Sequence, residues 1–370
     1  MKIAQIAPLY ESVPPKLYGG TERVVAHLTD ALVELGHEVT LFSAGGAATL
    51  ATEVPCREQA LRLDDTPLKS DFASHLSMLH RIRSRADEFD ILHFHIDLLH
   101  FPFFEAHASK SLTTLHGRLD IADLPQAYRL WNNFPLVSIS HNQRLPLPAA
   151  YWYGMIHHGL ADRHYPLTLG SGEYLAFLGR ISVEKSPDRA IQIAIAAGMP
   201  LKIAAKVDPT DRAYFHQVIE PMLDHPLIEF LGEIGDHEKG EFLGNARALL
   251  FPIDWPEPFG LVMIEAMACG TPVIAWRRGS VPEVIDHMRT GFIVDSMDEA
   301  IQAVKAVGLL DRRAIRREFD QRFSSHAMAR QYVELYEQLL AERSADPRAE
   351  ALAGDRSERL TTAGLGLTAS

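Results

Sequence analysis

The sequence is poor in cysteine: its 370 residues include two, Cys56 and Cys269. Two cysteines cannot form the disulfide framework of a small secreted domain, so we expect a reducing compartment, the cytoplasm. Long apolar runs are also missing, and no membrane-spanning helix is predicted. The first residues are typical of a short strand, so no signal peptide is expected. Peripheral contact with a membrane stays open.

Positive charge is scarce as well. The 36 lysines and arginines are outnumbered by 48 aspartates and glutamates, which gives a net charge of -12. This balance argues against a broad nucleic-acid-binding surface, and no nucleic-acid partner is predicted. The first strand–helix turn carries Gly19 and Gly20 without the full Gly-x-Gly-x-x-Gly fingerprint, which disfavours a dinucleotide-dependent oxidoreductase.

A convincing metal motif is a further absence, because no Asp-x-Asp pattern stands out. His93, His95, Asp97 and His100 follow one another closely, and the first three would share one face of a strand. A metal site needs a partner motif elsewhere in the chain, and we recognise none. We therefore interpret these residues as structural and predict no metal.

What the sequence does contain is an alternation of short apolar runs and amphipathic helices. Residues 2–7, 39–42 and 291–294 are typical of buried strands, one helix is expected after Gly20, and another is predicted over residues 71–89. This succession predicts an α/β fold with doubly wound parallel sheets. A chain of 370 residues is long for one domain, so we expect two.

The stretch at residues 255–276 is the most informative. Its pattern predicts a loop, a helix, a turn and a buried strand. Free backbone amides at the helix start, around Gly260 and Leu261, form a ready site for a phosphate. Glu257 precedes the helix and Glu265 lies about two turns inside it. Taken alone, both glutamates are also compatible with ordinary solvated charges.

Three further side chains are predicted at the carboxyl ends of strands, where α/β sheets bind ligands. Arg180 ends a strand that begins near residue 174, and Lys185 follows it before a helix. Two cations at one sheet edge suit a diphosphate. His116 follows a strand over residues 112–115. A hydrogen-bonded edge histidine and solvated surface cations remain as alternatives.

The run EPFGLVMIEAMACGTPVIA, with Glu257 and Glu265 separated by seven residues, resembles the signature of the retaining family 4 glycosyltransferases (glycosyl transferases group 1). The resemblance implies the GT-B fold, two Rossmann-like domains that face a cleft. It implies a first domain over residues 1–162, a donor-binding domain over 163–324, and a helix over about 325–343 that packs back on the first domain. A disordered tail is expected over 344–370, and a crossover strand over 155–159.

The resemblance also implies a site. Arg180 and Lys185 would face the donor's diphosphate, Glu257 the sugar hydroxyls and Glu265 the ribose, while His116 would orient the sugar. It assigns catalysis to Glu257, His116, Arg180 and Lys185, and donor binding to Gly19, Gly20, Arg180, Lys185, Glu233, Ile234, Phe259, Gly260, Leu261 and Glu265. Lys206 stays outside this set because Ala204 and Ala205 stand where relatives often have a glycine. Most relatives carry Asn-Gly where this chain has His158 and Gly159.

The activity implied is transfer of a sugar from a nucleotide diphosphate sugar, with a UDP-sugar favoured, and with retention of anomeric configuration. The acceptor is an unidentified small molecule, glycan or lipid-linked compound, contacted by loops over residues 9–18 and 119–133. No cofactor is expected besides the donor itself. An epimerase on the same architecture and a non-catalytic sugar-nucleotide binding protein are the alternatives.

Overall fold

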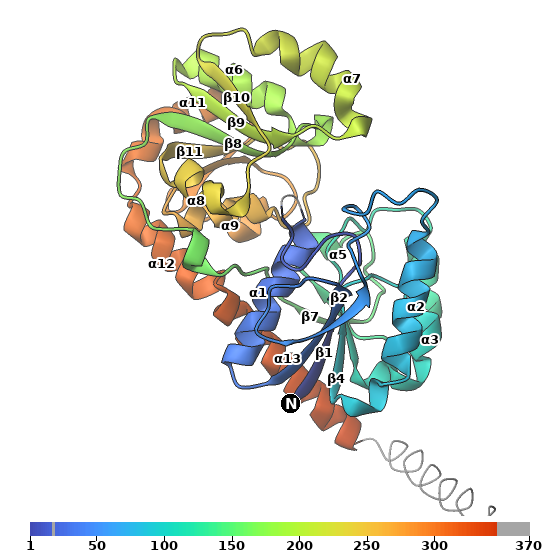
Figure 1. Ribbon diagram of the computed structural model, residues 1–370. Helices are drawn as coiled ribbons and strands as arrows, with labels where there is room; N and C mark the ends of the chain where they lie inside the picture. Colours follow the sequence, from blue (N-terminus) through green and yellow to red (C-terminus); the bar gives the residue numbers. More distant parts are fainter. Residues whose placement is uncertain (17–18, 346–370) are drawn as a thin grey trace, which may run out of the picture.

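The computed structural model describes residues 1–16 and 19–345. It has two α/β lobes, and each lobe is built on one parallel sheet (Figure 1). The predicted α/β fold class with two doubly wound sheets is therefore confirmed. The strands of the first sheet are β1 (Lys2–Ile6), β2 (Glu38–Ala44), β3 (Thr52–Arg57), β4 (Ile91–Phe94), β5 (Ser111–Thr114), β6 (Leu136–Ser138) and β7 (Trp152–Met155), and their order in space is β3-β2-β1-β4-β5-β6-β7.

The second sheet has six strands in the order β10-β9-β8-β11-β12-β13. Their bounds are β8 (Tyr174–Arg180), β9 (Leu201–Lys206), β10 (Ile228–Gly232), β11 (Ala246–Phe251), β12 (Val273–Trp276) and β13 (Gly291–Val294). The order reverses beside the first strand of each sheet, between β1 and β4 and between β8 and β11. Ligands of open α/β folds bind at such switch points, beyond the carboxyl ends of the strands.

Helices cover both faces of the sheets, so the central strands are buried on both sides. β4 and β12 are buried over their whole length, as expected for strands between two helical layers. The helices are α1 (Gly20–Glu34), α2 (Asp71–Arg83), α3 (Phe101–Phe104), α4 (Leu124–Leu130), α5 (His141–Arg144), α6 (Pro187–Ala197), α7 (Arg212–Tyr214), α8 (Asp236–Gly244), α9 (Leu261–Ala268), α10 (Val281–Val284), α11 (Met297–Ala306), α12 (Arg312–Arg322) and α13 (Ser325–Ala345).

The last helix, α13, returns to the first lobe and lies beside α1 (Figure 1). Tyr332 and Tyr336 of α13 are fully buried in the same apolar cluster as Ile3 of β1 and Leu28 of α1. The helix continues to Ala345, beyond the predicted end near residue 343. The rest of the predicted tail, residues 346–370, lies outside the described residues. The predicted domain boundary at residues 162 and 163 stays a prediction.

Some predicted limits are wrong. The helix predicted over residues 71–89 ends at Arg83, and a short 3-10 turn follows. The crossover strand predicted over 155–159 lies earlier, as β7, because Trp152 pairs with Leu136 of β6. β3 is not predicted from the sequence, since its residues include Pro55 and are only half buried. No helix in the described part of the chain combines the length and apolar character needed to cross a membrane.

Candidate functional site

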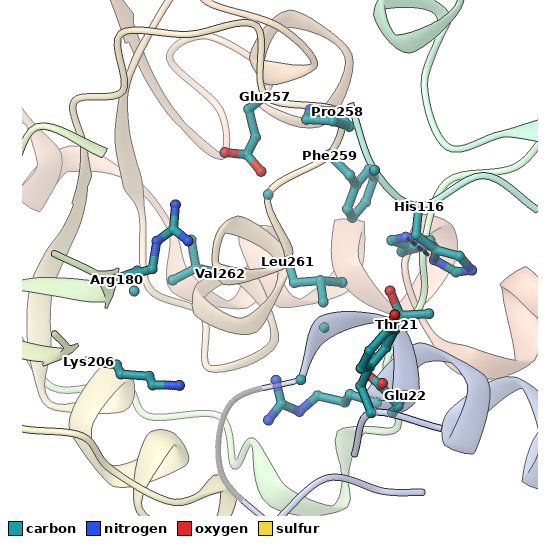
Figure 2. A pocket seen from close by; sticks show the side chains of 18 of the residues that line it. Thr21, Glu22, His116, Arg180, Lys206, Glu257, Pro258, Phe259, Leu261 and Val262 are labelled. Atoms are coloured by element: carbon teal, nitrogen blue, oxygen red, sulfur yellow. Dashed lines mark hydrogen bonds between the residues drawn. The ribbon is translucent and has the colours of Figure 1, made fainter. Parts of the chain in front are cut away.

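A cavity of about 580 Å³ lies between the carboxyl ends of the two sheets. Residues that follow the first sheet's strands line one side, and residues at the ends of β8, β9 and β11 line the other (Figure 2). The structure brings all of the predicted site residues to this cavity: Gly19, Gly20, His116, Arg180, Lys185, Glu233, Ile234, Glu257, Phe259, Gly260, Leu261 and Glu265. Their individual roles stay predictions.

The start of α9 forms part of the wall. Gly260 precedes this helix with a left-handed backbone, at φ 82°. A Cβ atom at this position would lie 2.9 Å from Cζ of Phe251 and 3.1 Å from Cε of Met263. Only glycine meets both conditions without strain. No side chain caps the helix, so its first amides remain available at the cavity wall.

Arg180 lies at the end of β8 and is 31% exposed. Its guanidinium is 3.5 Å from the carboxylates of Asp208 and Asp211. Lys206 is its partner in the register of β9, and Lys206 also lines the cavity. The sequence analysis left Lys206 out. The sequence did contain a signal for Lys206, because Lys206 ends the strand next to that of Arg180, and the two cations therefore lie at one edge of the sheet.

The predicted phosphate-binding cation and sugar-binding carboxylate touch each other. Nζ of Lys185 donates a hydrogen bond to Oε2 of Glu257. Nε1 of Trp255 donates to the same oxygen at 2.8 Å. Lys185 also lies 5.2 Å from the centre of the Trp255 ring. The carboxylate of Glu257 is thus oriented by two donors, and the cation is held within reach of the cavity.

Glu265 is buried and heavily hydrogen-bonded. Its Oε1 accepts from the hydroxyl of Tyr165 at 3.0 Å and from Nζ of Lys239 at 3.1 Å, and Arg23 lies 3.8 Å away. Arg23 and Lys239 also contact Asp236, at 2.6 and 3.0 Å. Burial alone would raise the pKa of Asp236, but the charges of Lys239 and Arg23 outweigh it and lower that pKa.

The sequence analysis missed Arg23 and Lys239, although both line the cavity. Arg23 lies on α1, in the first lobe, and Lys239 lies on α8, in the second. Neither side chain belongs to a recognisable pattern. Only the meeting of α1 with α8 and α9 brings them to one carboxylate.

His116 follows β5 and has both ring nitrogens engaged. Nε2 lies 2.9 Å from Nδ1 of His95, and Nδ1 lies 3.3 Å from Nε2 of His158. Burial lowers the pKa of His116 to about 3, so its ring is neutral at physiological pH. In this arrangement His116 meets the cavity without a free ring nitrogen. The resemblance did not anticipate that feature.

The other histidines of this region are built into the core. His93 contacts the hydroxyls of Tyr336 and Thr114 at 2.7 and 2.8 Å. His100 stacks on Phe94, with ring centres 3.7 Å apart. The prediction that Asp97 shares a strand face with His93 and His95 is wrong, because β4 ends at Phe94 and Asp97 has φ 51°. Among residues 1–16 and 19–345, no cluster of three or more His, Cys, Asp or Glu side chains has a metal-binding arrangement.

The two predicted acceptor loops differ in their relation to the cavity. The first, over residues 9–18, contributes Tyr10, while Leu17 and Tyr18 lie outside the described residues. The second, over residues 119–133, contributes no side chain to the lining of this cavity within the described part of the chain. Arg62 and His75 line the cavity beside Tyr10 instead.

Three solved structures share the fold over most of their length. AviGT4, a glycosyltransferase involved in avilamycin A biosynthesis, has a TM-score of 0.70 and 25% identity, over 92% of this chain and 98% of that one. Sucrose-phosphate synthase from Thermosynechococcus elongatus has a TM-score of 0.73 and 20% identity, over 92% and 99%. HepE from Anabaena, in complex with UDP-glucose, has a TM-score of 0.68 and 17% identity, over 91% and 100%.

Curated relatives match a shorter part of the chain. N-acetyl-alpha-D-glucosaminyl L-malate synthase of Bacillus anthracis is 35% identical over 132 residues, which is 34% of each chain. D-inositol 3-phosphate glycosyltransferase 2 of Catenulispora acidiphila is 28% identical over 165 residues, 41% of this chain and 38% of that protein. The matched stretches thus span little more than a third of these relatives.

Two family models match consecutive parts of the sequence. The model for Glycosyltransferase Family 4 matches residues 18–163, and the model for glycosyl transferases group 1 matches residues 167–327. Together with the GT-B fold of the solved neighbours, these matches show that the chain belongs to the group 1 glycosyltransferases of GT-B architecture.

Proposed function

We propose that this glycosyltransferase moves a sugar from a nucleotide diphosphate sugar to a hydroxyl of an acceptor, with retention of anomeric configuration. The observation that carries the proposal is the composition of one cavity. Cations at the ends of β8 and β9, the start of α9, Glu257 and Glu265 line the cavity together with His116. Figure 2 shows Arg180, Lys206 and Glu257 on the side of the second lobe and His116 on the side of the first. This combination of cations, amides and hydroxyl acceptors suits a diphosphate sugar.

Departure of the nucleoside diphosphate is the step that the cations assist. Negative charge grows on the leaving oxygen as the bond to the sugar carbon breaks. In the proposal, Arg180, Lys185 and the amides near Gly260, which all line the cavity, stabilise that charge. Because these groups supply the positive charge, the proposed reaction calls for no metal and no cofactor.

The ion pair between Lys185 and Glu257 has a direct consequence for donor binding. When a donor enters, the diphosphate competes with Glu257 for the ammonium group. Glu257 keeps the hydrogen bond from Trp255 and turns its remaining lone pairs to the sugar hydroxyls. Binding of the phosphate and orientation of the sugar are therefore coupled through this pair.

Retention follows, in the proposal, from attack on the same face that the leaving group departs from. A phosphate oxygen of the leaving group takes the proton of the acceptor hydroxyl. Glu257, one of the three carboxylates in the predicted set, is held by Lys185 and Trp255, and in the proposal it binds the sugar hydroxyls and does not attack the sugar carbon. A covalent glycosyl–enzyme trapped with a slow donor would contradict this assignment.

A thermal-shift screen of nucleotide diphosphate sugars tests the proposal. UDP-sugars come first, because the neighbour HepE was solved with UDP-glucose. A donor present at a hundred times its dissociation constant stabilises the protein by about 2.7 kcal/mol. We expect one donor class to raise the melting temperature and to be hydrolysed slowly without an acceptor.

The outcomes of the screen separate the alternatives. Slow release of free sugar supports a transferase, and an interconverted sugar nucleotide indicates an epimerase. Binding without any turnover indicates a sugar-nucleotide binding protein. Absence of a shift with every donor would contradict the proposal. Malate and inositol 3-phosphate, the compounds in the names of the two curated relatives, are the first acceptors to test beside lipid-linked ones.

A further inference from the structure

Four side chains, three of them buried and the fourth, His116, half-buried, form a continuous line along the carboxyl edge of the first sheet. Gln5 lies on β1, His95 and His116 follow β4 and β5, and His158 follows β7. Oε1 of Gln5 lies 2.8 Å from Nε2 of His95, and His95 Nδ1 lies 2.9 Å from His116 Nε2. The last link joins His116 Nδ1 to His158 Nε2 at 3.3 Å. The line thus runs from the core to the cavity.

The direction of these hydrogen bonds is set at Gln5. Its Nε2 donates to the hydroxyl of Tyr336 at 3.2 Å and lies 3.3 Å from Nδ1 of His93. The amide oxygen therefore faces His95, and an amide oxygen accepts hydrogen bonds but never donates them. Nε2 of His95 must carry the hydrogen in this link.

Neutral rings pass that direction along the line. Burial lowers the pKa of His116 to about 3 and holds the pKa values of His95 and His158 well below their ordinary range. A neutral imidazole has one donor nitrogen and one acceptor nitrogen. His95 Nδ1 is thus an acceptor, so His116 donates from Nε2. His158 in turn donates to Nδ1 of His116.

We propose that Gln5 and His95 are positioning residues that fix His116 in the tautomer with hydrogen on Nε2, so that His116 meets the substrate as a hydrogen-bond acceptor through Nδ1. The link from His158 is the longest of the three, and it is the one that a ligand can replace. This assignment rests on the proposed function. It predicts that His116 binds a hydroxyl of the sugar, and that it does not bind the diphosphate. An acceptor nitrogen repels phosphate oxygens, which need donors.

His158 completes the line at the cavity. Its ring stacks on His116, with centres 5.0 Å apart, and packs edge-on against Phe259, which lies just before α9. Nδ1 of His158 is buried and has no hydrogen-bond partner in the described residues. The proposed direction explains this unsatisfied acceptor. Every donor nitrogen in the line points towards Gln5, so Nδ1 of His158, at the other end, carries no hydrogen.

Nitrogen-15 NMR of the histidine rings in the full-length protein tests the proposal. We expect His116 and His95 of the parent to show the tautomer with hydrogen on Nε2. Gln5→Met removes the amide oxygen and keeps the size of the side chain, so His116 should shift towards a mixture of both tautomers. His100→Gln is the matched control, because His100 is equally buried but contacts Thr113 outside the line. It should leave the His116 signals unchanged.

Hydrogen on Nδ1 of His116 in the parent would overturn the proposal, and so would an unchanged His116 pattern in folded Gln5→Met. If circular dichroism shows that Gln5→Met does not fold, His158→Phe takes its place. That change removes the outer link, and the Nε2 tautomer of His116 should persist because its direction is set from Gln5. A switch of tautomer in His158→Phe would equally overturn the proposal.

Turnover gives the second measurement. With a donor identified by the screen, Gln5→Met should lower turnover roughly tenfold, about the effect of one lost hydrogen bond, with little change in the donor KM. His100→Gln should retain parental turnover. Equal turnover in parent and Gln5→Met would overturn the positioning role. If no donor is found, the proposed function fails while the NMR spectra still decide the tautomer.

Discussion

Arg180, at the end of β8, lines the cavity and also contacts two carboxylates. Asp208 and Asp211 each lie 3.5 Å from the guanidinium, which nevertheless lines the cavity. These carboxylates restrict the side chain at the end of β8, so under the proposed function less side-chain entropy would be lost on binding a phosphate. They also compete with that phosphate, which limits the gain from each new contact.

Arg180→Ala tests the predicted role of this cation. A hydrogen bond to a charged group contributes about 1.5–3 kcal/mol, so kcat/KM for the donor should fall roughly ten- to a hundredfold. Arg189→Ala is the control, because Arg189 has a similar exposure of 30% but pairs with Asp254 outside the cavity. Steady-state kinetics with the identified donor decides between them. Equal losses in the two variants would contradict the assignment of Arg180 to the diphosphate.

At the scale of elements, α9 is the clearest link between sequence and site. It is short, with eight residues, and its cavity end is formed by a left-handed glycine in place of a side-chain cap. Its interior residues, such as Met263 and Ile264, are fully buried against the second sheet. The helix is therefore fixed by packing, while its first amides stay at the cavity wall.

Gly260→Ala should disturb this arrangement. The left-handed backbone costs about 1–2 kcal/mol for alanine, and the close approach to Phe251 and Met263 adds about 1–3 kcal/mol of overpacking. Gly198→Ala is the matched control, because Gly198 has φ 64° and nothing within 4 Å of its Cβ position. Chemical denaturation should show a larger decrease in the free energy of unfolding for Gly260→Ala than for Gly198→Ala. Gly260→Ala should also bind the donor more weakly. Equal losses would mean that the packing around Gly260 adjusts freely.

At the scale of the whole molecule, direct contacts between the lobes border the cavity. The hydroxyl of Ser140 donates to the carbonyl oxygen of Pro258 at 2.7 Å. Glu283 of α10 accepts hydrogen bonds from two backbone amides of α5, each at 2.8 Å. Arg23 of α1 meets Asp236 of α8 at 2.6 Å. The relative position of the sheets, and hence the shape of the site, depends on these contacts.

Two neutral histidines near this junction, His27 (buried) and His116 (half-buried), predict how the stability of the protein depends on pH. Burial lowers the pKa of His27 and of His116 to about 3, against about 6.5 in an unfolded chain. Between these values the unfolded chain binds more protons, so stability is complete above about pH 6.5 and falls as the pH drops towards 3. Each of the two histidines should lower the free energy of unfolding by about 2 kcal/mol when the pH falls from 7 to 5.

Denaturant unfolding at pH 7 and pH 5 measures this loss. His27→Gln removes one titrating group. The difference in the free energy of unfolding between pH 7 and pH 5 should therefore be about 2 kcal/mol smaller than in the parent. His216→Gln is the control, because His216 is exposed and its variant should keep the parental difference. A parent whose stability is the same at both pH values would contradict the buried neutral state of these rings.

Much of the fold follows from local patterns that survive in the structure. The limits of β13 and the start of α9 agree with the apolar periodicity and the glycine signals. The end of the helix that begins at residue 71 and the place of β7 do not agree with the prediction. The place of β7 depends on its pairing with β6, and the apolar pattern of β7 itself does not specify that partner. Strand β3 is too polar and too exposed to be recognised from its own residues.

The sequence by itself determined which groups meet at the cavity, because Arg180, Lys185, Gly260, Glu257 and Glu265 lie in continuous segments whose strand–loop–helix pattern is local. The tertiary structure alone decided how those groups are held. Arg23 and Lys239 meet at Glu265, and Gln5 reaches His116 through His95, only because α1, α8 and the strands of the first sheet converge there. Such contacts join residues distant in sequence, and their hydrogen-bond directions depend on burial, which no local pattern encodes.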